Sequence, residues 1–274
     1  MQYVFFTVIL ALMLGCSPGS RHQTKTFVKD PEALSDKIDL NKVKIVCPSN
    51  DCPESLALFV TVYKFKTLNP NLNPNTYQAF KTCNSSVVKN KDNNMFELYT
   101  SGHCSHKEAD IVSFKKQYPE LNNYTYQSRS HYLYIYNKEL DDTLKVQLAE
   151  PDWNFYNPED LFSLDIMKFT IHQYLFADLE ITNSTQLPKL AHLYTLRRDS
   201  GSLFTVKKQN CDVLSKSSDF TYELGRCLIL GGDSGAPVIS NGEIYGFISH
   251  TNNYSLGGQF VPSQCISSDS CQSP

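Results

Sequence analysis

The stretch Gly231-Gly232-Asp233-Ser234-Gly235-Ala236-Pro237-Val238 decides how the rest of the chain is interpreted. Only glycine readily adopts a positive φ or lets another backbone come close. Two glycines, a serine and a third glycine therefore predict a tight turn that presents one hydroxyl. The N–H groups around such a serine can converge on one point, as an oxyanion hole requires. A Gly/Ser surface loop has the same composition, so the remaining chain must supply a histidine, an acid and a scaffold.

The composition is that of an ordinary globular protein. The chain has 274 residues, of which 41% are hydrophobic and 19% charged, enough for one large or two small domains with a real core. The formal net charge is −3 and no long basic run is present, so nucleic acid is not an expected partner.

The chain opens with an apolar segment from Tyr3 to Leu14, which is too short to span a bilayer and is typical of a signal peptide. We therefore predict a signal peptide over residues 1–16 and a leader or pro-segment over residues 17–44. Two interpretations of Cys16 stay open. Met13-Leu14-Gly15-Cys16 is similar to a lipoprotein processing site, which would make a lipid on Cys16 the sole membrane contact. Ordinary cleavage between Gly15 and Ser20 would instead remove that cysteine.

The nine cysteines indicate disulfides. Without Cys16 an even number of cysteines remains in a chain with a predicted signal peptide, and thiols oxidise outside the cytoplasm. The local spacing favours the neighbouring pairs Cys47–Cys52, Cys83–Cys104, Cys211–Cys227 and Cys265–Cys271. Spacing alone does not fix the pairing. The rival interpretation is a zinc site, but no paired Cys-x-x-Cys motif is present.

Short strands separated by turn residues predict an all-β fold, a barrel or a sandwich. The first group of expected strands is Leu56–Phe65, Ser86–Val88, Met95–Thr100, Tyr132–Tyr136, Leu144–Leu148 and Ile166–Ile171. The second group is His192–Arg197, Leu203–Lys207, Cys227–Leu230, Pro237–Ser240, Ile244–Ser249 and Gln259–Val261. Residues 172–190 are the expected connection between the two groups.

Four motifs in one order make the chain resemble the trypsin/chymotrypsin-like serine protease family. Cys83-Asn-Ser-Ser-Val-Val88 resembles the family's Cys-Gly-Gly-Ser-Leu-Ile, and Thr100-Ser-Gly-His-Cys104 resembles its Thr-Ala-Ala-His-Cys. Gly232-Asp-Ser-Gly-Ala-Pro-Val238 is similar to Gly-Asp-Ser-Gly-Gly-Pro-Val, and Tyr245-Gly-Phe-Ile-Ser249 to the strand that follows. The resemblance covers residues 55–262. It implies two six-stranded antiparallel β-barrels, residues 45–171 and 191–274, with the active site in the cleft between them.

The resemblance implies a catalytic triad of Ser234, His103 and an aspartate. A serine hydroxyl needs a base to take its proton, and imidazole can act first as base and then as acid. Asp165 and Asp160 both precede alternating apolar residues that suit a half-buried strand. Asp165 is favoured, because Asp165-Ile166 is the closer match to the family's Asp-Ile-Ala-Leu-Leu. His106 forms a His-x-x-His pair with His103, but no ligand cluster supports a metal, and no metal or cofactor is expected.

The same resemblance makes the N–H groups of Gly232 and Ser234 the oxyanion hole. It also equates Asp233 with an aspartate that, in many relatives, pairs with an N-terminus freed by cleavage. The family's usual Ile-Val-Gly-Gly start is absent; Lys44-Ile45-Val46 is the nearest imitation, with a cut after Lys44 as one candidate and a plain strand as the other. A buried carboxylate without a partner is costly, so Asp233 needs a donor.

For the substrate pocket, the resemblance points to Leu228 at its base and to Ser249 and His250 in its wall. Leu228 is not an aspartate, so cleavage after Lys or Arg has no support, and an apolar side chain before the cut bond is the first expectation. The leading hypothesis is an exported serine endopeptidase, secreted or extracytoplasmic, that acts on proteins or peptides. The alternative is a catalytically inactive binding protein on the same scaffold, motivated by the missing activation sequence and by Ser101-Gly102 in place of two alanines.

Overall fold

The computed structural model describes residues 26–28, 38–49, 51–69, 71, 75–91, 93–159, 164–173, 175, 177–216, 221–251 and 257–267. The predicted signal peptide, residues 1–16, lies outside these ranges, and so does Asp160. No helix in the described ranges is long and apolar enough to cross a membrane.

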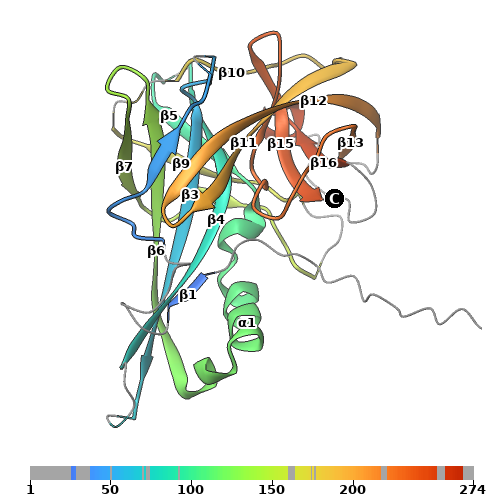
Figure 1. Cartoon of the computed structure of the whole chain (residues 1–274). Coiled ribbons are helices and arrows are strands. Elements are labelled where there is room, and N and C mark those ends of the chain that lie inside the picture. The colour runs from blue at the N-terminus through green and yellow to red at the C-terminus, as the bar shows by residue number, and fades with distance from the viewer. Residues whose placement is uncertain are drawn as a thin grey trace, which may run out of the picture.

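The chain forms two sheets with few helices (Figure 1). The first sheet has the order β7-β6-β3-β4-β5-β9-β8, and β1 pairs with β4. Its strands are β1 (Thr26–Val28), β3 (Leu56–Thr67), β4 (Thr76–Lys89), β5 (Phe96–Thr100), β6 (Tyr124–Asn137), β7 (Asp142–Leu148), β8 (Trp153–Asn154) and β9 (Met167–Ile171). Unlike the closed six-stranded barrel expected, this sheet has eight strands, and no ladder joins its two ends within the described residues.

The second sheet is a closed barrel. The strands β15-β14-β11-β12-β13-β16 follow one another, and β16 pairs back with β15, so six antiparallel strands form a ring. They are β11 (Leu190–Ser200), β12 (Leu203–Lys216), β13 (Tyr222–Gly225), β14 (Pro237–Ser240), β15 (Glu243–Thr251) and β16 (Gly257–Pro262). The prediction of an all-β fold is confirmed, and the C-terminal unit is the closed six-stranded antiparallel barrel that was expected.

Two short strands belong to the second sheet although the sequence boundaries place them elsewhere. β2 (Lys44–Val46) falls at the start of the predicted N-terminal barrel, but it pairs in parallel with β12. β10 (Glu180–Ile181) lies in the predicted connection and pairs in parallel with β15. Each contains an isoleucine, and Ile45 is only 1% exposed.

The predicted strand Cys227–Leu230 is wrong, because this stretch is a loop. Arg226, just before it, has a positive φ of 56°. The side chain of Gln209 then takes the place of a neighbouring strand: its Oε1 accepts from Leu228 N–H at 2.9 Å and its Nε2 donates to Leu228 O at 2.8 Å. The strand β13 ends before this point, at Gly225.

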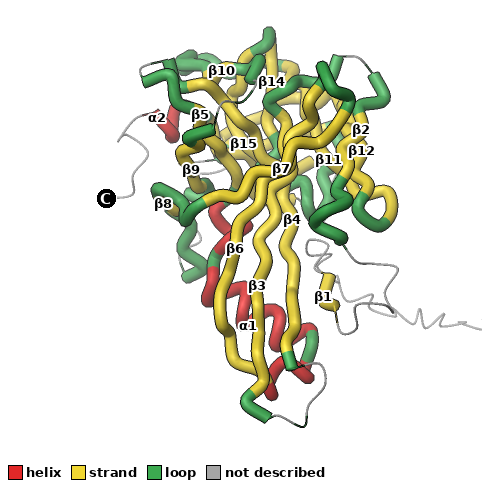
Figure 2. The backbone as a smooth tube through the Cα atoms, turned by 90° about the vertical axis from the view of Figure 1, so that its left-hand side faces the viewer, coloured by secondary structure: helices red, strands yellow, loops and turns green. Residues whose placement is uncertain are grey.

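A long arm distinguishes the first sheet. In Figure 2, β3, β4 and β6 extend well beyond the remaining strands, with the helix α1 (Lys107–Gln117) beside them. Buried aromatic side chains hold the helix to the arm, among them Tyr63, Phe65 and Phe114. Acidic residues in the first turn of α1 and lysines in its last turn suit the helix dipole. The short 3-10 helices η1 (Gly102–Ser105) and η2 (Pro119–Asn123) flank α1, and α2 (Gln264–Ser267) follows β16.

One apolar core joins the two sheets. It contains Leu58 and Tyr99 from the first sheet and Leu196 and Phe247 from the second. The rings of Tyr99 and Phe247 stack with centroids 5.6 Å apart. The end of β5 and the loop before β14 meet at this junction, because a Cβ added to Gly235 would lie 2.3 Å from Thr100 Oγ1.

Candidate active site

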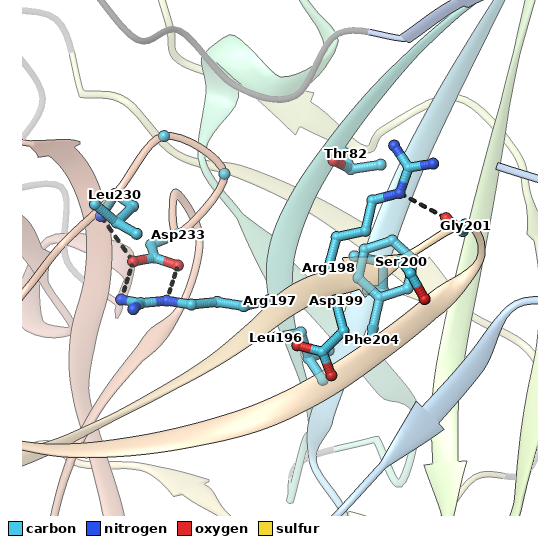
Figure 3. A pocket seen from close by; sticks show the side chains of 13 residues that line it. Thr82, Leu196, Arg197, Arg198, Asp199, Ser200, Gly201, Phe204, Leu230 and Asp233 are labelled. Atoms are coloured by element: carbon cyan, nitrogen blue, oxygen red, sulfur yellow. Dashed lines mark hydrogen bonds and ion pairs between the residues drawn. The ribbon is translucent and has the colours of Figure 1, made fainter. Parts of the chain in front are cut away.

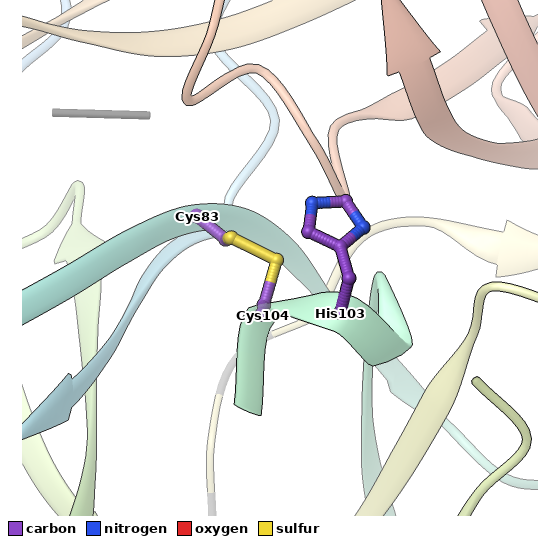
Figure 4. Close-up of side chains that lie close together, drawn as sticks. All are labelled: Cys83, His103 and Cys104. Carbon is purple, nitrogen blue, oxygen red and sulfur yellow. A yellow bond between two sulfur atoms is a disulfide. The ribbon is translucent and has the colours of Figure 1, made fainter. Parts of the chain in front are cut away.

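His103 lies in η1, the turn directly after β5, and contacts from β4 and α1 fix the position of this turn. The disulfide Cys83–Cys104 joins the next residue to β4 (Figure 4). The buried Lys81 donates to the His103 carbonyl and to Asp110 of α1. Tyr63 donates to the other oxygen of Asp110 at 2.5 Å. The turn that presents His103 thus rests on a covalent link and on a buried ion pair.

Asp165 holds the ring of His103. The Asp165 side chain is 3% exposed, its Oδ2 accepts from His103 Nδ1 at 2.6 Å, and its Oδ1 accepts from the His103 backbone N–H at 2.8 Å. Burial alone would raise the pKa of Asp165, but the charge of His103 and its hydrogen bond outweigh burial, with smaller help from His250, and lower the pKa to about 2. Two donors from one residue fix both the tautomer and the orientation of the imidazole.

Ser249 contacts Asp165 rather than forming a free pocket wall. Its hydroxyl donates to Asp165 Oδ2 at 2.8 Å. Because a hydroxyl has one proton, the 2.5 Å contact between Ser249 Oγ and His250 Nδ1 makes His250 the donor there. The His250 ring lies 6.1 Å from the His103 ring, centroid to centroid. Two histidines are therefore arranged around one carboxylate.

Leu228 does not form the base of a buried pocket. It is 43% exposed, because the loop after Arg226 turns it outward. The structure brings two of the three expected pocket residues, Ser249 and His250, to Asp165 and keeps Leu228 apart at the surface.

Ser234 lies in a tight loop pressed against the first sheet. Gly232 and Gly235 have φ values of +99° and +83°. A Cβ on Gly235 would come within 2.1 Å of the Asn84 carbonyl oxygen, so no larger residue fits. Asn84 also donates its backbone N–H to Ser234 O at 2.8 Å and its side-chain amide to Gly232 O at 2.7 Å. Asn84 follows Cys83, so the serine loop is tied to the strand that carries the His103 disulfide.

Alternate N–H groups of the serine loop donate hydrogen bonds within the protein. Asp233 N–H donates to Leu230 O at 3.0 Å, and Gly235 N–H donates to Ile248 O at 2.7 Å. In the described part of the chain, the N–H groups of Gly232 and Ser234 have no protein acceptor. Two such donors beside a serine can stabilise the negative charge of a tetrahedral intermediate.

The hydroxyl of Ser234 forms no hydrogen bond with His103 among the described residues. Contacts between a nucleophile and its base are often long without substrate and shorten in the complex. Ser234 is linked to the His103 turn through β4, because Asn84, which contacts the serine loop, follows Cys83. The sulfurs of Cys83 and Cys104 and a ring nitrogen of His103 lie within 4.8 Å of one another. Both sulfurs are bound in the disulfide, so this group is not a metal site.

Asp233, the residue before Ser234, is paired with Arg197 of β11 (Figure 3). Asp233 is 1% exposed, and burial raises its pKa above the ordinary value even though Arg197 and the Leu230 N–H act to lower it. A cavity of about 460 Å³ lies beside this pair and is also lined by Gly232, Arg198 and Phe204.

Three of the four predicted disulfides are present: Cys47–Cys52, Cys83–Cys104 and Cys211–Cys227. Cys265 is also disulfide-bonded. Its predicted partner, Cys271, lies outside the described residues.

The sequence did not indicate three residues that shape this site, Lys81, Asn84 and Arg197, nor the contact of Ser249 with Asp165. Asn84 and Ser249 stand inside the quoted motifs, so their closeness to the site could have been inferred, although their partners could not. Lys81 and Arg197 lie on strands with no local signal; only the fold brings them to Asp110 and Asp233.

Comparison with known proteins identifies the fold of this chain but finds no related sequence. No model of a known protein family matches the chain, and no curated protein sequence matches it. The structure of GrC has 12% sequence identity and a TM-score of 0.51, with 81% of this chain and 96% of that chain covered. Human heparin binding protein also has 12% identity and a TM-score of 0.51, with 78% of this chain and 88% of that chain covered. The chain has the trypsin-like two-barrel fold, as the motifs predicted.

Proposed function

We propose that the protein is a serine endopeptidase in which Ser234 is the nucleophile, His103 the general base and acid, and Asp165 the residue that orients His103. One observation carries the proposal: a buried carboxylate accepts from both the ring and the backbone of His103, at 2.6 and 2.8 Å. This is the geometry that keeps Nε2 of the imidazole unprotonated and directed away from the acid.

The chemistry follows from these groups. His103 Nε2 takes the proton of Ser234 Oγ as the oxygen attacks the peptide carbonyl carbon. The N–H groups of Gly232 and Ser234 stabilise the oxyanion, and the imidazolium is stabilised by Asp165. His103 then gives its proton to the leaving amine, and an acyl-enzyme ester remains on Ser234. Water, deprotonated by His103, hydrolyses the ester.

We infer that the substrates are proteins or peptides and that the enzyme works outside the cytoplasm. Three disulfides fit an oxidising compartment. The exposed Leu228 and the histidine at position 250 give no support for a basic side chain before the cut bond.

The test uses the full chain, purified, with its N-terminus and intact mass determined. The wild type should hydrolyse peptides and react with a phosphonate probe at Ser234. Ser234→Ala should abolish labelling, and both Ser234→Ala and His103→Ala should lower kcat by about 10⁴- to 10⁶-fold. Ser128→Ala, at an exposed position of β6, is the control and should behave like the wild type. A folded wild type that neither cleaves peptides nor reacts with the probe would instead favour a binding protein on this fold.

A further inference from the structure

The residue before the proposed nucleophile has a built-in counter-ion. Arg197 Nη2 lies 2.8 Å from Asp233 Oδ2, and Arg197 Nε lies 3.3 Å from Asp233 Oδ1. Two guanidinium nitrogens therefore face two carboxylate oxygens, the geometry that gives an Arg–carboxylate pair both strength and direction. Figure 3 shows Arg197 reaching across to Asp233, whereas Arg198 beside it turns to Gly201.

The same guanidinium fixes the start of the serine loop. Arg197 Nη2 also donates to Leu228 O at 2.7 Å, and Leu230 N–H donates to Asp233 Oδ2 at 2.8 Å. The loop is thus held at residues 228, 230 and 233 by one side chain and its partner. Arg197 itself stands on β11, which is paired with β12 and β14. The anchor is part of the barrel and moves with it.

This anchoring determines where the two unused N–H groups point. The peptide unit after Asp233 carries the Ser234 N–H, and Gly232 precedes Asp233 in the same anchored loop, so a loop released from Arg197 would be free to turn both groups. While Arg197 holds Asp233, the Asp233 N–H stays on Leu230 O and the Ser234 N–H stays available. The ion pair therefore keeps the oxyanion donors arranged before any substrate binds.

A newly freed N-terminus at Ile45 is not available for this task. Lys44–Val46 is the strand β2, where Lys44 N–H donates to Ser202 O at 3.0 Å and Ile45 N–H donates to Thr143 Oγ1 at 2.8 Å. Ile45 is buried, and its side chain belongs to the core that joins the sheets. Cleavage after Lys44 would disrupt β2, while the carboxylate of Asp233 already has its cation.

We propose that Arg197 is a positioning residue that holds the serine loop in its active arrangement, so that the enzyme needs no cleavage at its N-terminal side to form the oxyanion hole. This inference rests on the proposed serine endopeptidase function. It assigns the activation of that site to a residue of β11, present in the chain from the moment it folds.

The first arm of the test compares Arg197→Met and Arg197→Lys with the wild type. Loss of oxyanion donors typically costs about 10²- to 10³-fold, so Arg197→Met should lower kcat/KM and the rate of phosphonate labelling by about 10²-fold, mainly through kcat. Arg197→Lys should recover part of both rates, because it restores the cation without the fork. The pH profile should keep its shape, since His103 and Asp165 are untouched. Arg226→Met, which removes an exposed Arg–Asp pair, is the matched control and should leave the rates unchanged.

The second arm asks whether cleavage is needed. The wild type and Lys44→Gln should have equal activity, with the bond between residues 44 and 45 intact by mass. Activity that appears only after a cut at Lys44 would overturn the inference, and so would a folded Arg197→Met with wild-type labelling. If Arg197→Met does not fold, the activity of the uncut wild-type chain still decides whether cleavage at Lys44 is needed. A wild type that never reacts at Ser234, cut or uncut, would overturn the proposed function and this inference with it.

Discussion

Asp165 and Asp233 are both buried aspartates within the same site, yet their pKa values shift in opposite directions. Asp165 accepts from His103 N–H, His103 Nδ1 and Ser249 Oγ, and its pKa falls to about 2. Among the described residues Asp233 accepts from Arg197 and from the Leu230 N–H, and burial raises its pKa. Each carboxylate accepts three hydrogen bonds, so the comparison teaches that the balance between burial and the neighbouring charges decides how firmly a carboxylate keeps its charge. His103 and His250 outweigh burial at Asp165, whereas Arg197 does not outweigh it at Asp233.

Asp165→Asn should have the largest effect on activity. The amide would donate to His103 Nδ1, which forces the proton onto Nε2 and prevents it from accepting the proton of Ser234. We expect kcat to fall by about 10⁴-fold, and the free energy of unfolding at neutral pH to fall by about 2 kcal/mol because the Asp165 charge is removed. Steady-state kinetics and thermal unfolding measure the two. Asp160→Asn tests the competing acid directly, and Asp152→Asn, an exposed aspartate bonded to Thr170, is the matched control; equal losses in Asp160→Asn would contradict the assignment.

A third buried aspartate extends the comparison, because Asp110 depends on Lys81 much as Asp233 depends on Arg197. Lys81→Met would leave the buried Asp110 carboxylate without its cation and should lower the free energy of unfolding by about 3–5 kcal/mol. Adding Asp110→Asn should restore much of this loss, since the stranded charge disappears while Tyr63 keeps an acceptor. Denaturant titrations give both values. Lys42→Met, which breaks an exposed pair with Asp39, should cost less than about 1 kcal/mol.

The dependence of stability on pH should separate Asp165 from Asp233. The pKa of Asp165 is lower in the folded chain than its ordinary 3.8, so its contribution is present above pH 4 and is lost as the pH falls toward 2. The contribution is about 2 kcal/mol. Asp233 has a raised pKa, so it favours the folded state at low pH and loses that contribution as the pH rises. Unfolding free energies between pH 5 and 2 should therefore fall less steeply in Asp165→Asn than in the wild type, and more steeply in Arg197→Met/Asp233→Asn.

The sequence predicted the fold class and pointed to many residues of the candidate site, because both depend on local signals. Alternating β-branched and aromatic residues predicted most of the strands, and the His-Cys and Gly-Asp-Ser-Gly motifs pointed to two loops that the fold brings to one junction. Helix α1 was missed because its buried face is small, essentially Phe114 and Asp110. The strand predicted at Cys227–Leu230 failed because Gln209, distant in sequence, bonds the backbone of Leu228. The partners of Asp233 and Asp110 could not be predicted, since an arginine or a lysine on a strand carries no sign of the carboxylate that another strand or a helix will bring to it.

Ser249→Ala should have the smallest effect, and it tests whether donor number sets the behaviour of Asp165. The variant removes one of three donors and leaves both hydrogen bonds from His103 in place. A hydrogen bond to a charged group contributes about 1.5–3 kcal/mol, but the remaining donors can tighten, so we expect kcat to fall by about tenfold. The pKa of Asp165 should rise with the loss of a donor, which would move the acid unfolding midpoint upward. Ser240→Ala, which removes a hydroxyl bonded to Leu190 O on a neighbouring strand, is the matched control. An unchanged kcat together with an unchanged acid midpoint would mean that His103 alone stabilises the Asp165 charge. Asp165 and Asp233 would then differ in the identity of their partner and not in the number of donors.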